Sequence, residues 1–400
     1  MSAGGGVHYV FVVTALAPGG TLSVMRQFWP RLERRGRVEV ISHGPVGAPV
    51  PYPVTVTGGR FGGPLRFPAI WIYAFRTFRA SLRAARRVGP TVLLPQDSLA
   101  TGAAVGLAGR LTGTPVLLME HGTAVAVASD YFWRERVRTP RLRDRLTKPL
   151  LRASVGLLHR ISLRTANRVL VAGAESEERL RSMGVGPERI DRYHFPVDLE
   201  RFRPADPERR DAARARWSLA SSDDVVVSVS RLAPEKGLDL VVDAIAGLPS
   251  AQRPLLVLAG DGPEREALAE RADRAGVAAR FVGALDDPAD VAELLAAADV
   301  FVYAGRQGTN TPYAVLEAMA AGMAVVASTE PAVHGPMLSE GRGIAVPPGD
   351  VDALRAALAR FLSVPQLRAD SGRLARAHVE EHHAPSVLDH ELAAIFGSEP

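Results

Sequence analysis

Short apolar runs alternate with longer stretches of helical periodicity along this chain of 400 residues. The runs are rich in Val, Leu and Ile with few polar positions, which is typical of strands buried on both faces of a parallel sheet. The segments between them, such as 263–275 and 350–362, place their apolar residues on one helical face. Strands are predicted at 7–13, 38–43, 91–96, 115–121, 168–173, 225–231, 254–260, 279–284, 300–305, 324–329 and 343–346.

This alternation predicts an α/β protein with two doubly wound sheets, because a chain of this length exceeds one hydrophobic core. Three prolines interrupt the periodicity at 196–207, so we expect an N-terminal domain at 1–200 and a C-terminal domain at 201–380. Two or three helices are predicted between 363 and 396. The arginine-dense stretch 133–148 is predicted to connect a strand to a helix that begins near Pro149.

Composition excludes several classes of protein. Hydrophobic residues make up 47% and charged residues 23% of the chain, as in ordinary globular domains. Cysteine is absent, which excludes disulfides and thiolate metal sites and suits a reducing cytoplasm. No apolar run approaches the roughly 18 residues of a membrane span, and the first residues lack a basic leader region. We therefore expect a soluble, cytoplasmic protein.

Charge is divided unevenly between the two halves of the chain. Residues 1–200 carry a net charge of +14 and residues 201–400 a net charge of −9, within a total of +5. The basic half is suited to an anionic partner, such as a phosphorylated acceptor or the inner face of an anionic membrane that it contacts peripherally. A solvated, arginine-rich surface is the alternative. Nucleic acid is disfavoured because few aromatic residues are interleaved with the arginines.

Candidate ligand-binding residues follow the predicted strands. Ligands of open α/β sheets bind outside the carboxyl ends of the strands. Glycines and cations gather at those positions, where the backbone must turn sharply or approach a ligand closely. The positions are Gly19-Gly20, Glu120-His121-Gly122, 231–237, Gly260-Asp261-Gly262 and 305–317.

Arg231 and Lys236 are the leading candidates for phosphate binding. Both lie in the loop SRLAPEKG after a buried strand, and Lys236 is one of only two lysines among 48 basic residues. An arginine fork and a lysine point charge on one loop can neutralise a pyrophosphate. The alternative is a pair of surface cations beside a helix start.

Glu317 is the candidate for binding a ribose. Thr311 and Pro312 are predicted to be the N-cap and first residue of a helix that runs to about Ala321. The free amides of that helix end would favour an anion. Glu317 lies inside the helix among small and apolar residues, where a carboxylate needs hydrogen-bond donors such as ribose hydroxyls. A structural bond to a neighbouring backbone group is the alternative.

His121 ends an apolar strand and is predicted to emerge at the rim of the sheet, where it could bind substrate or serve as an ordinary hydrogen-bonded side chain. No metal site is predicted. His378, His382 and His383 have helical spacing but lack a supporting set of ligands. Asp286 and Asp287 are instead predicted to begin a helix at Pro288.

The motifs together resemble those of family 4 glycosyltransferases. The resemblance rests in the second half on SRLAPEKG at 230–237, LAGDGP at 258–263, 281–283, 297–303 and LEAMAAGMAVVAS at 316–328. In the first half it rests on Gly19-Gly20, His121-Gly122, ANRVLVAGAESEERL at 166–180 and VDLERFRP at 197–204. It spans nearly the whole chain in the right order.

The resemblance implies the GT-B fold, with two Rossmann-like domains and a helix within 381–400 that crosses back onto the first domain. It also implies retaining transfer from a nucleotide diphosphate sugar, with no metal or other cofactor. Arg231 and Lys236 would hold the diphosphate, Glu317 the ribose, and His121 the transferred sugar or the reacting centre. Further donor contacts are expected from Gly19, Gly20, Gly260, Gly262, Val282, Gly283, Thr309, Asn310, Thr311 and Pro312.

Two positions depart from the family pattern. Thr309 replaces the glutamate that normally lies eight residues before the acid matching Glu317, and that glutamate normally faces the donor sugar. Backbone amides of Asn310 and Thr311 would still be able to serve the sugar. Phe195-Pro196 replaces the usual Asn-Gly near the hinge. These departures predict an unusual donor.

The leading prediction is a glycosyltransferase that acts on an anionic, lipid-linked or natural-product acceptor. A nucleotide-sugar epimerase of the same fold is one alternative, although it would need an acid/base set for the sugar ring. A binder of nucleotide sugars without activity is another, which the missing carboxylate at position 309 favours. The donor's base and sugar and the identity of the acceptor stay open.

Overall fold

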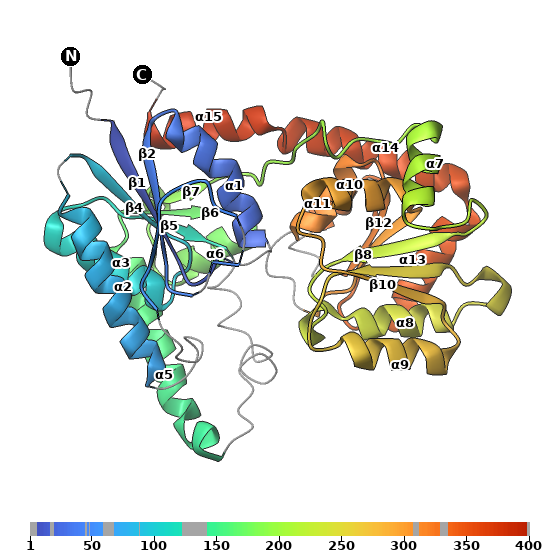
Figure 1. The fold of residues 1–400 in the computed structure, drawn as a ribbon, viewed down its shortest axis with the longest axis horizontal. Coiled ribbons are helices and arrows are strands. Elements are labelled where there is room, and N and C mark those ends of the chain that lie inside the picture. Colours follow the sequence, from blue (N-terminus) through green and yellow to red (C-terminus); the bar gives the residue numbers. More distant parts are fainter. Residues whose placement is uncertain are drawn as a thin grey trace. The chain divides into compact units, whose positions relative to one another are not determined.

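The computed structural model divides the chain into two compact units. The first combines the chain up to Tyr193 with the segment from Asp389 onward, and the second runs from His194 to Leu388. The sequence placed the boundary a few residues later, at 196–207. The structure describes residues 6–16, 20–44, 46–47, 49–58, 68–87, 89–121, 142–306, 312–328 and 335–397. Figure 1 shows the elements of both units.

The first unit holds a parallel sheet in two sections, with the orders β3-β2-β1-β4 and β5-β6-β7. A bridge between Leu93 and Val116 joins β4 to β5. The central strand β1 has five consecutive buried residues, as expected of a strand covered on both faces. The strands are β1 (Val7–Val13), β2 (Gly36–Ser42), β3 (Val54–Val56), β4 (Thr91–Pro95), β5 (Leu117–Glu120), β6 (Arg168–Val171) and β7 (Ile190–Arg192).

Helices connect these strands, as parallel pairing requires. Among them α3 packs against both α2 and α5. The C-terminal helix α15 (Pro385–Phe396) closes the unit, because Asp389 accepts a 2.8 Å bond from Arg31 and Phe396 packs edge-on against Tyr9. The other helices of the unit are α1 (Gly20–Glu33), α2 (Ala69–Ala85), α3 (Ala100–Thr112), α5 (Leu142–Thr165), α6 (Ala174–Ser182) and the 3₁₀ turn η2 (Pro187–Arg189).

The second unit holds one six-stranded sheet in the order β10-β9-β8-β11-β12-β13, and every pairing is parallel. The chain winds outward in one direction from β8 and in the other from β11. The carboxyl ends of these two strands therefore form the topological switch point, where doubly wound folds bind ligands. The strands are β8 (Val225–Val229), β9 (Leu255–Ala259), β10 (Ala279–Gly283), β11 (Val300–Tyr303), β12 (Ala324–Ser328) and β13 (Ile344–Val346).

Three helices of the second unit begin at aspartate caps. The side chains of Asp206, Asp287 and Asp350 accept bonds from backbone amides in the first turns of α7, α10 and α13, which satisfies amides that have no partner within the helix. The helix start predicted at Asp287 is confirmed. The helices are α7 (Pro207–Arg216), α8 (Leu238–Ala246), α9 (Arg265–Ala275), α10 (Pro288–Ala297), α11 (Tyr313–Ala320), α12 (Gly335–Leu338), α13 (Val351–Ser363) and α14 (Pro365–His382), with 3₁₀ turns η3 (Pro234–Lys236) and η4 (Ser250–Gln252).

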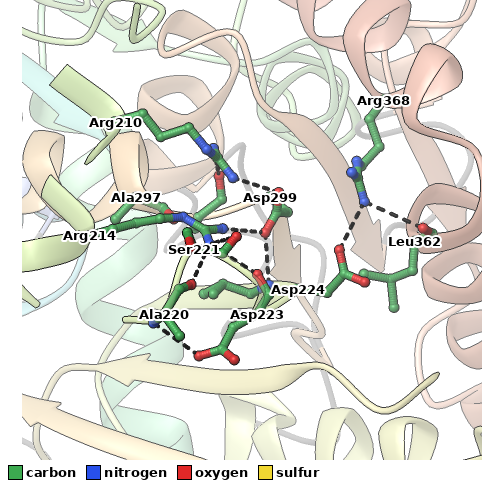
Figure 2. Close-up of polar contacts among 12 residues, drawn as sticks. Arg210, Arg214, Ala220, Ser221, Asp223, Asp224, Ala297, Asp299, Leu362 and Arg368 are labelled. Carbon is green, nitrogen blue, oxygen red and sulfur yellow. Dashed lines mark hydrogen bonds and ion pairs between the residues drawn. The ribbon is translucent and has the colours of Figure 1, made fainter. Parts of the chain in front are cut away.

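A buried arginine fastens the amino ends of β8 and β11. Figure 2 shows Arg214 of α7 donating to the carboxylate of Asp299 at 2.9 Å and to the carbonyl of Ala297 at 3.1 Å. It also donates to the carbonyl of Ala220 at 2.7 Å, and Arg210 donates to the second Asp299 oxygen at 2.7 Å. Because every charge here has a protein partner, this edge of the sheet is braced from within.

The sequence prediction fails at two kinds of place. It misses β3 and β7, three-residue strands too short to show an alternating pattern. It also starts a helix near Pro149, whereas α5 begins at Leu142 and contains that proline. Pro149 is exposed, so water can satisfy the carbonyl group that a proline leaves without a donor.

Candidate functional site

Loops after β8 and β9 meet at the carboxyl edge of the second unit's sheet. Gly260 and Gly262 have φ angles of +138° and +158°. A Cβ atom on either would lie 1.9 Å from the carbonyl oxygen of Ser230 or 2.2 Å from that of Leu232. Both positions therefore require glycine, and the close approach of the two backbones fixes the loop that carries Arg231 and Lys236.

The same loop is held against the end of β11. Gly237 has a φ angle of +62°, and a Cβ atom there would lie 2.0 Å from the carbonyl oxygen of Ala304. The amide of Arg306 donates to the carbonyl of Glu235 at 3.0 Å. Helix α8 thus starts at the switch point between β8 and β11, where its free amides and its dipole favour an anion.

Arg231 and Lys236 have different environments on this loop. Arg231 has an exposed side chain that forms an ion pair with Glu235. Lys236 is half-buried, and its Nζ atom lies 5.6 Å from the centre of the Tyr303 ring. A cation over an aromatic face keeps its charge while losing part of its hydration. Lys236 is therefore the better placed of the two to meet a phosphate group without first breaking an ion pair.

Arg306 is a cation at this edge that the sequence analysis did not single out. It forms two parallel bonds with Asp239, of 2.8 and 2.6 Å, and one of 2.7 Å with the carbonyl of Pro234. Although burial raises the pKa of Asp239, the bonds and charge of Arg306 lower it further, so the net shift is downward. Arg306 therefore ties the loop after β11 to α8. Its position directly after a strand end was the signal that could have found it.

Glu317 lies on α11, the helix that follows β11. Burial raises the pKa of its carboxyl group to about 7, and the charge of Arg201 opposes that shift. Its neighbours Val315, Leu316 and Ala318 are buried, whereas Glu317 itself keeps some exposure. Within the described part of the chain, no residue forms a hydrogen bond with this carboxyl group. The site therefore presents a poorly solvated acceptor that a hydroxyl-bearing ligand can satisfy.

The start of α11 differs from the prediction by one residue. Pro312 is the N-cap, with φ −63° and ψ 133°, and the helix begins at Tyr313. Its extended ψ keeps Pro312 out of the helix, whereas the sequence analysis made it the first helical residue. Thr309, Asn310 and Thr311 lie outside the described residues.

The departure at Phe195-Pro196 has a local partner in the second unit. The hydroxyl of Tyr313 donates to the carbonyl of Pro196, and the Tyr313 ring packs against Phe195. The first residue of α11 therefore contacts the segment that leads in from the first unit. On the far side of the sheet, Val282 and Gly283 end β10, and open space surrounds the α-carbon of Gly283.

His121 follows β5 in the first unit. Gln96 Nε2 donates to the carbonyl of Leu94, so Gln96 Oε1 faces the imidazole and accepts from His121 Nε2 at 3.2 Å. The hydroxyl of Tyr193 lies 3.5 Å from Nδ1. Burial lowers the pKa of His121 to about 4. The imidazole is therefore neutral at pH 7 and serves as a positioned polar group rather than as a cation.

Gly20 is the first residue of α1, and Gly19 and Gly122 lie outside the described residues. The His378 and His382 rings are 4.5 Å apart. Yet in the described ranges no three His, Asp or Glu side chains form a group able to hold a metal ion. None of the described helices is long and apolar enough to cross a membrane. Two hollows of about 330 and 450 Å³, both lined by Arg164 and Arg189, lie at the amino edge of the first sheet, away from every predicted site residue.

Two protein families match this chain, one in each half. Glycosyltransferase Family 4 matches residues 18–201, and Glycosyl transferases group 1 matches residues 209–378. The chain belongs to the family 4 glycosyltransferases and has their GT-B fold.

Curated relatives and solved structures agree with this assignment. A GDP-mannose-dependent monoacylated α-(1-6)-phosphatidylinositol monomannoside mannosyltransferase of Corynebacterium glutamicum is 34% identical over 52% of this chain and 56% of its own length. A D-inositol 3-phosphate glycosyltransferase of Mycobacterium avium is 33% identical over 58% and 54%. The chain thus spans about half the length of the curated relatives it matches.

In the solved structures the similarity extends over the whole chain. The crystal structure of Anabaena Alr3699/HepE in complex with UDP and glucose has a TM-score of 0.79 at 18% identity and covers 98% of this chain and 99% of its own. The lipopolysaccharide glycosyltransferase WaaG has a TM-score of 0.75 at 17% identity, covering 98% and 100%. At such identities the likeness concerns the fold.

Proposed function

We propose that the protein transfers a sugar from a nucleotide diphosphate sugar to an anionic acceptor, with retention of anomeric configuration and without a bound metal. The observation that carries this proposal is Glu317, a poorly solvated carboxyl group without a described hydrogen-bond partner on the helix after β11. Ribose hydroxyls are donors of the right kind for it. Lys236, at the switch point of the same sheet, supplies the charge for the diphosphate.

The reaction breaks the bond between the sugar's anomeric carbon and the diphosphate oxygen and forms one to an acceptor oxygen. The nucleoside diphosphate leaves with the bonding electrons, and the acceptor hydroxyl loses its proton. Negative charge grows on the leaving phosphate, so Lys236 stabilises the transition state more than the ground state. Arg231 contributes once it exchanges Glu235 for phosphate. We assign the metal's usual charge-neutralising role to these two side chains, so activity should persist in EDTA.

The donor and acceptor are proposed from chemistry that the relatives share. GDP-mannose stands in the name of the Corynebacterium relative, and the Anabaena structure contains UDP and glucose, so both bases belong in the test. The names of both curated relatives contain an inositol phosphate. Such an anionic acceptor suits the net charge of +14 on residues 1–200.

A donor panel tests the proposal. The protein is incubated with GDP-mannose, UDP-glucose and related donors, with and without inositol phosphate acceptors, and products are identified by mass spectrometry and NMR. Release of free nucleoside diphosphate only with acceptor, together with a product of the donor's anomeric configuration, is the expected result. A new epimer of the donor sugar would instead identify an epimerase. Tight donor binding without turnover would identify a binding protein.

A further inference from the structure

Three large apolar side chains stand in solvent on helix α2. Trp71, Ile72 and Phe75 are 38%, 42% and 59% exposed. The opposite face of the same helix is buried and packs through Ile70 and Tyr73. Exposing three such residues within five positions is costly in water, and clusters of this kind mark interaction sites.

The exposed face of α2 changes from apolar to cationic along its length. Trp71, Phe75, Arg79 and Arg83 follow one another at intervals of four residues, so they lie along one side of the helix. The Arg79 guanidinium lies 5.9 Å from the centre of the Phe75 ring. No described residue forms an ion pair with Arg79 or Arg83.

Helix α5 repeats this arrangement. Leu150 and Leu157 are 53% and 49% exposed, and Arg160 and Arg164 are exposed beyond them. The two helices touch at the apolar end, since Trp71 Nε1 donates to Ser154 Oγ at 3.0 Å. Leu150 lies four residues before Ser154 and Leu157 three after it, so both leucines lie on the side of α5 that Trp71 contacts.

The two helices run in the same direction, because each leads from the carboxyl end of one parallel strand to the amino end of the next. Their apolar ends therefore lie together at the carboxyl edge of the sheet, the edge that holds His121, and their arginines lie toward the other edge. Helices α2 and α3 contain no acidic residue, and α5 contains only Asp144.

We propose that this face, defined by Trp71, Ile72, Phe75, Leu150 and Leu157 with the arginines of α2 and α5, docks on an anionic lipid bilayer. Aromatic and aliphatic side chains enter the interfacial region while arginines meet the headgroup phosphates, which is the binding mode of interfacial amphipathic helices. Docking would place the carboxyl edge of the first unit's sheet beside the lipid headgroups.

Helix capping and self-association each account for only part of this face. Arginines in the last turns of α2 and α5 also complement the helix dipoles, but that does not explain five exposed apolar side chains. A second copy of the chain is a poor occupant, because two faces rich in arginine and almost free of acids repel each other. Charge complementarity favours a negatively charged surface.

Vesicle co-sedimentation of the full chain without donor tests the proposal. The probes are vesicles of phosphatidylcholine with and without phosphatidylglycerol. We expect the wild-type protein to bind only the anionic vesicles and to dissociate as salt increases. The Ile72→Ser/Phe75→Ser variant should bind at least about tenfold more weakly, since it removes two side chains that would enter the interface. The control Val364→Ser, at a side chain of the second unit that is 44% exposed, should bind like wild type.

The charge contribution is tested separately with Arg79→Gln/Arg83→Gln. This variant should bind more weakly at low salt and show a flatter salt dependence. Equal binding by wild type and both variants, equal binding to neutral vesicles, or concentration-dependent dimerisation that Ile72→Ser/Phe75→Ser abolishes would each overturn the proposal. Membrane binding does not depend on the transfer reaction, and turnover of a water-soluble acceptor should be unchanged in Ile72→Ser/Phe75→Ser, so the two proposals fail independently.

Discussion

The two edges of the second unit's sheet use charge in opposite ways. At the amino edge the guanidinium of Arg214 is buried and bonded to one carboxylate and several carbonyl groups. At the carboxyl edge Lys236 lies over an aromatic ring, and the Glu317 carboxyl group has no hydrogen-bond partner among the described residues. Charges that hold the fold are satisfied by the protein, whereas charges that serve a ligand are left for the ligand. Substitutions at the two edges should therefore affect different properties.

The largest effect is expected at the amino edge. Arg214→Ala removes the donor group that joins α7 to the ends of β8 and β11, and leaves Asp299 with a weaker set of partners. We expect the free energy of unfolding to fall by about 3 kcal/mol or more, measured by urea denaturation. Arg210→Ala, at the more exposed partner of Asp299, should cost about 1 kcal/mol. Equal losses in the two variants would contradict the assignment of Arg214 as the brace.

At the carboxyl edge the effect should appear in turnover instead. Lys236→Ala should lower turnover by at least about 10²-fold, the scale for losing one charge-stabilising group, with a thermal midpoint close to that of wild type. Lys148→Ala, at the chain's other lysine, is the control and should keep its activity. Near-normal turnover of Lys236→Ala would defeat the diphosphate assignment.

Glu317 sharpens the comparison through pH. Its pKa of about 7 lies above the ordinary 4.5, so its contribution to stability is fully present below pH 4.5 and is lost as pH rises through 7. Ribose hydroxyls bind the ionised form, so affinity for the nucleoside diphosphate should instead increase across that range. Calorimetric titration at several pH values should show this rise in wild type and in the exposed control Glu270→Gln. In Glu317→Gln we expect affinity about tenfold lower and independent of pH; a retained pH dependence would assign it to another group.

The smallest effect is one of selectivity. Thr309→Glu restores the side chain that family members usually carry eight residues before Glu317. We expect it to change the ratio of turnover among donors that share a base but differ in the sugar, because that residue type normally faces the sugar. Competition between paired donors measures this ratio. An unchanged preference would mean that position 309 does not face the sugar.

Much of the fold could be predicted from the sequence because buried parallel strands leave a strong signal. The predicted strand at 7–13 coincides with β1, and each of the other ten overlaps an observed strand to within a few residues. The failures have local causes: β3 and β7 are too short for a pattern, and Pro149 is tolerated inside α5 because it faces solvent.

The candidate site was predicted less completely than the fold. Strand-end position indicated Arg231 and Lys236 equally, but the ion pair with Glu235 and the ring of Tyr303 give them different environments. Arg306 was missed because its partner Asp239 is distant in sequence. Gln96 and Tyr193, which hold the neutral imidazole of His121, could not be paired with it by spacing alone.

The sequence by itself determined the alternation of strands and helices, the family, and the positions at strand ends where a ligand would be met, because these follow from local periodicity and from residue types within one loop. Only the tertiary structure decided which charges are already neutralised and which are left for a partner. Pairing, burial and the resulting pKa values depend on side chains that folding brings together from distant parts of the chain. The exposed face of α2 and α5 is such a case, because neither helix alone shows that its apolar end adjoins the other's.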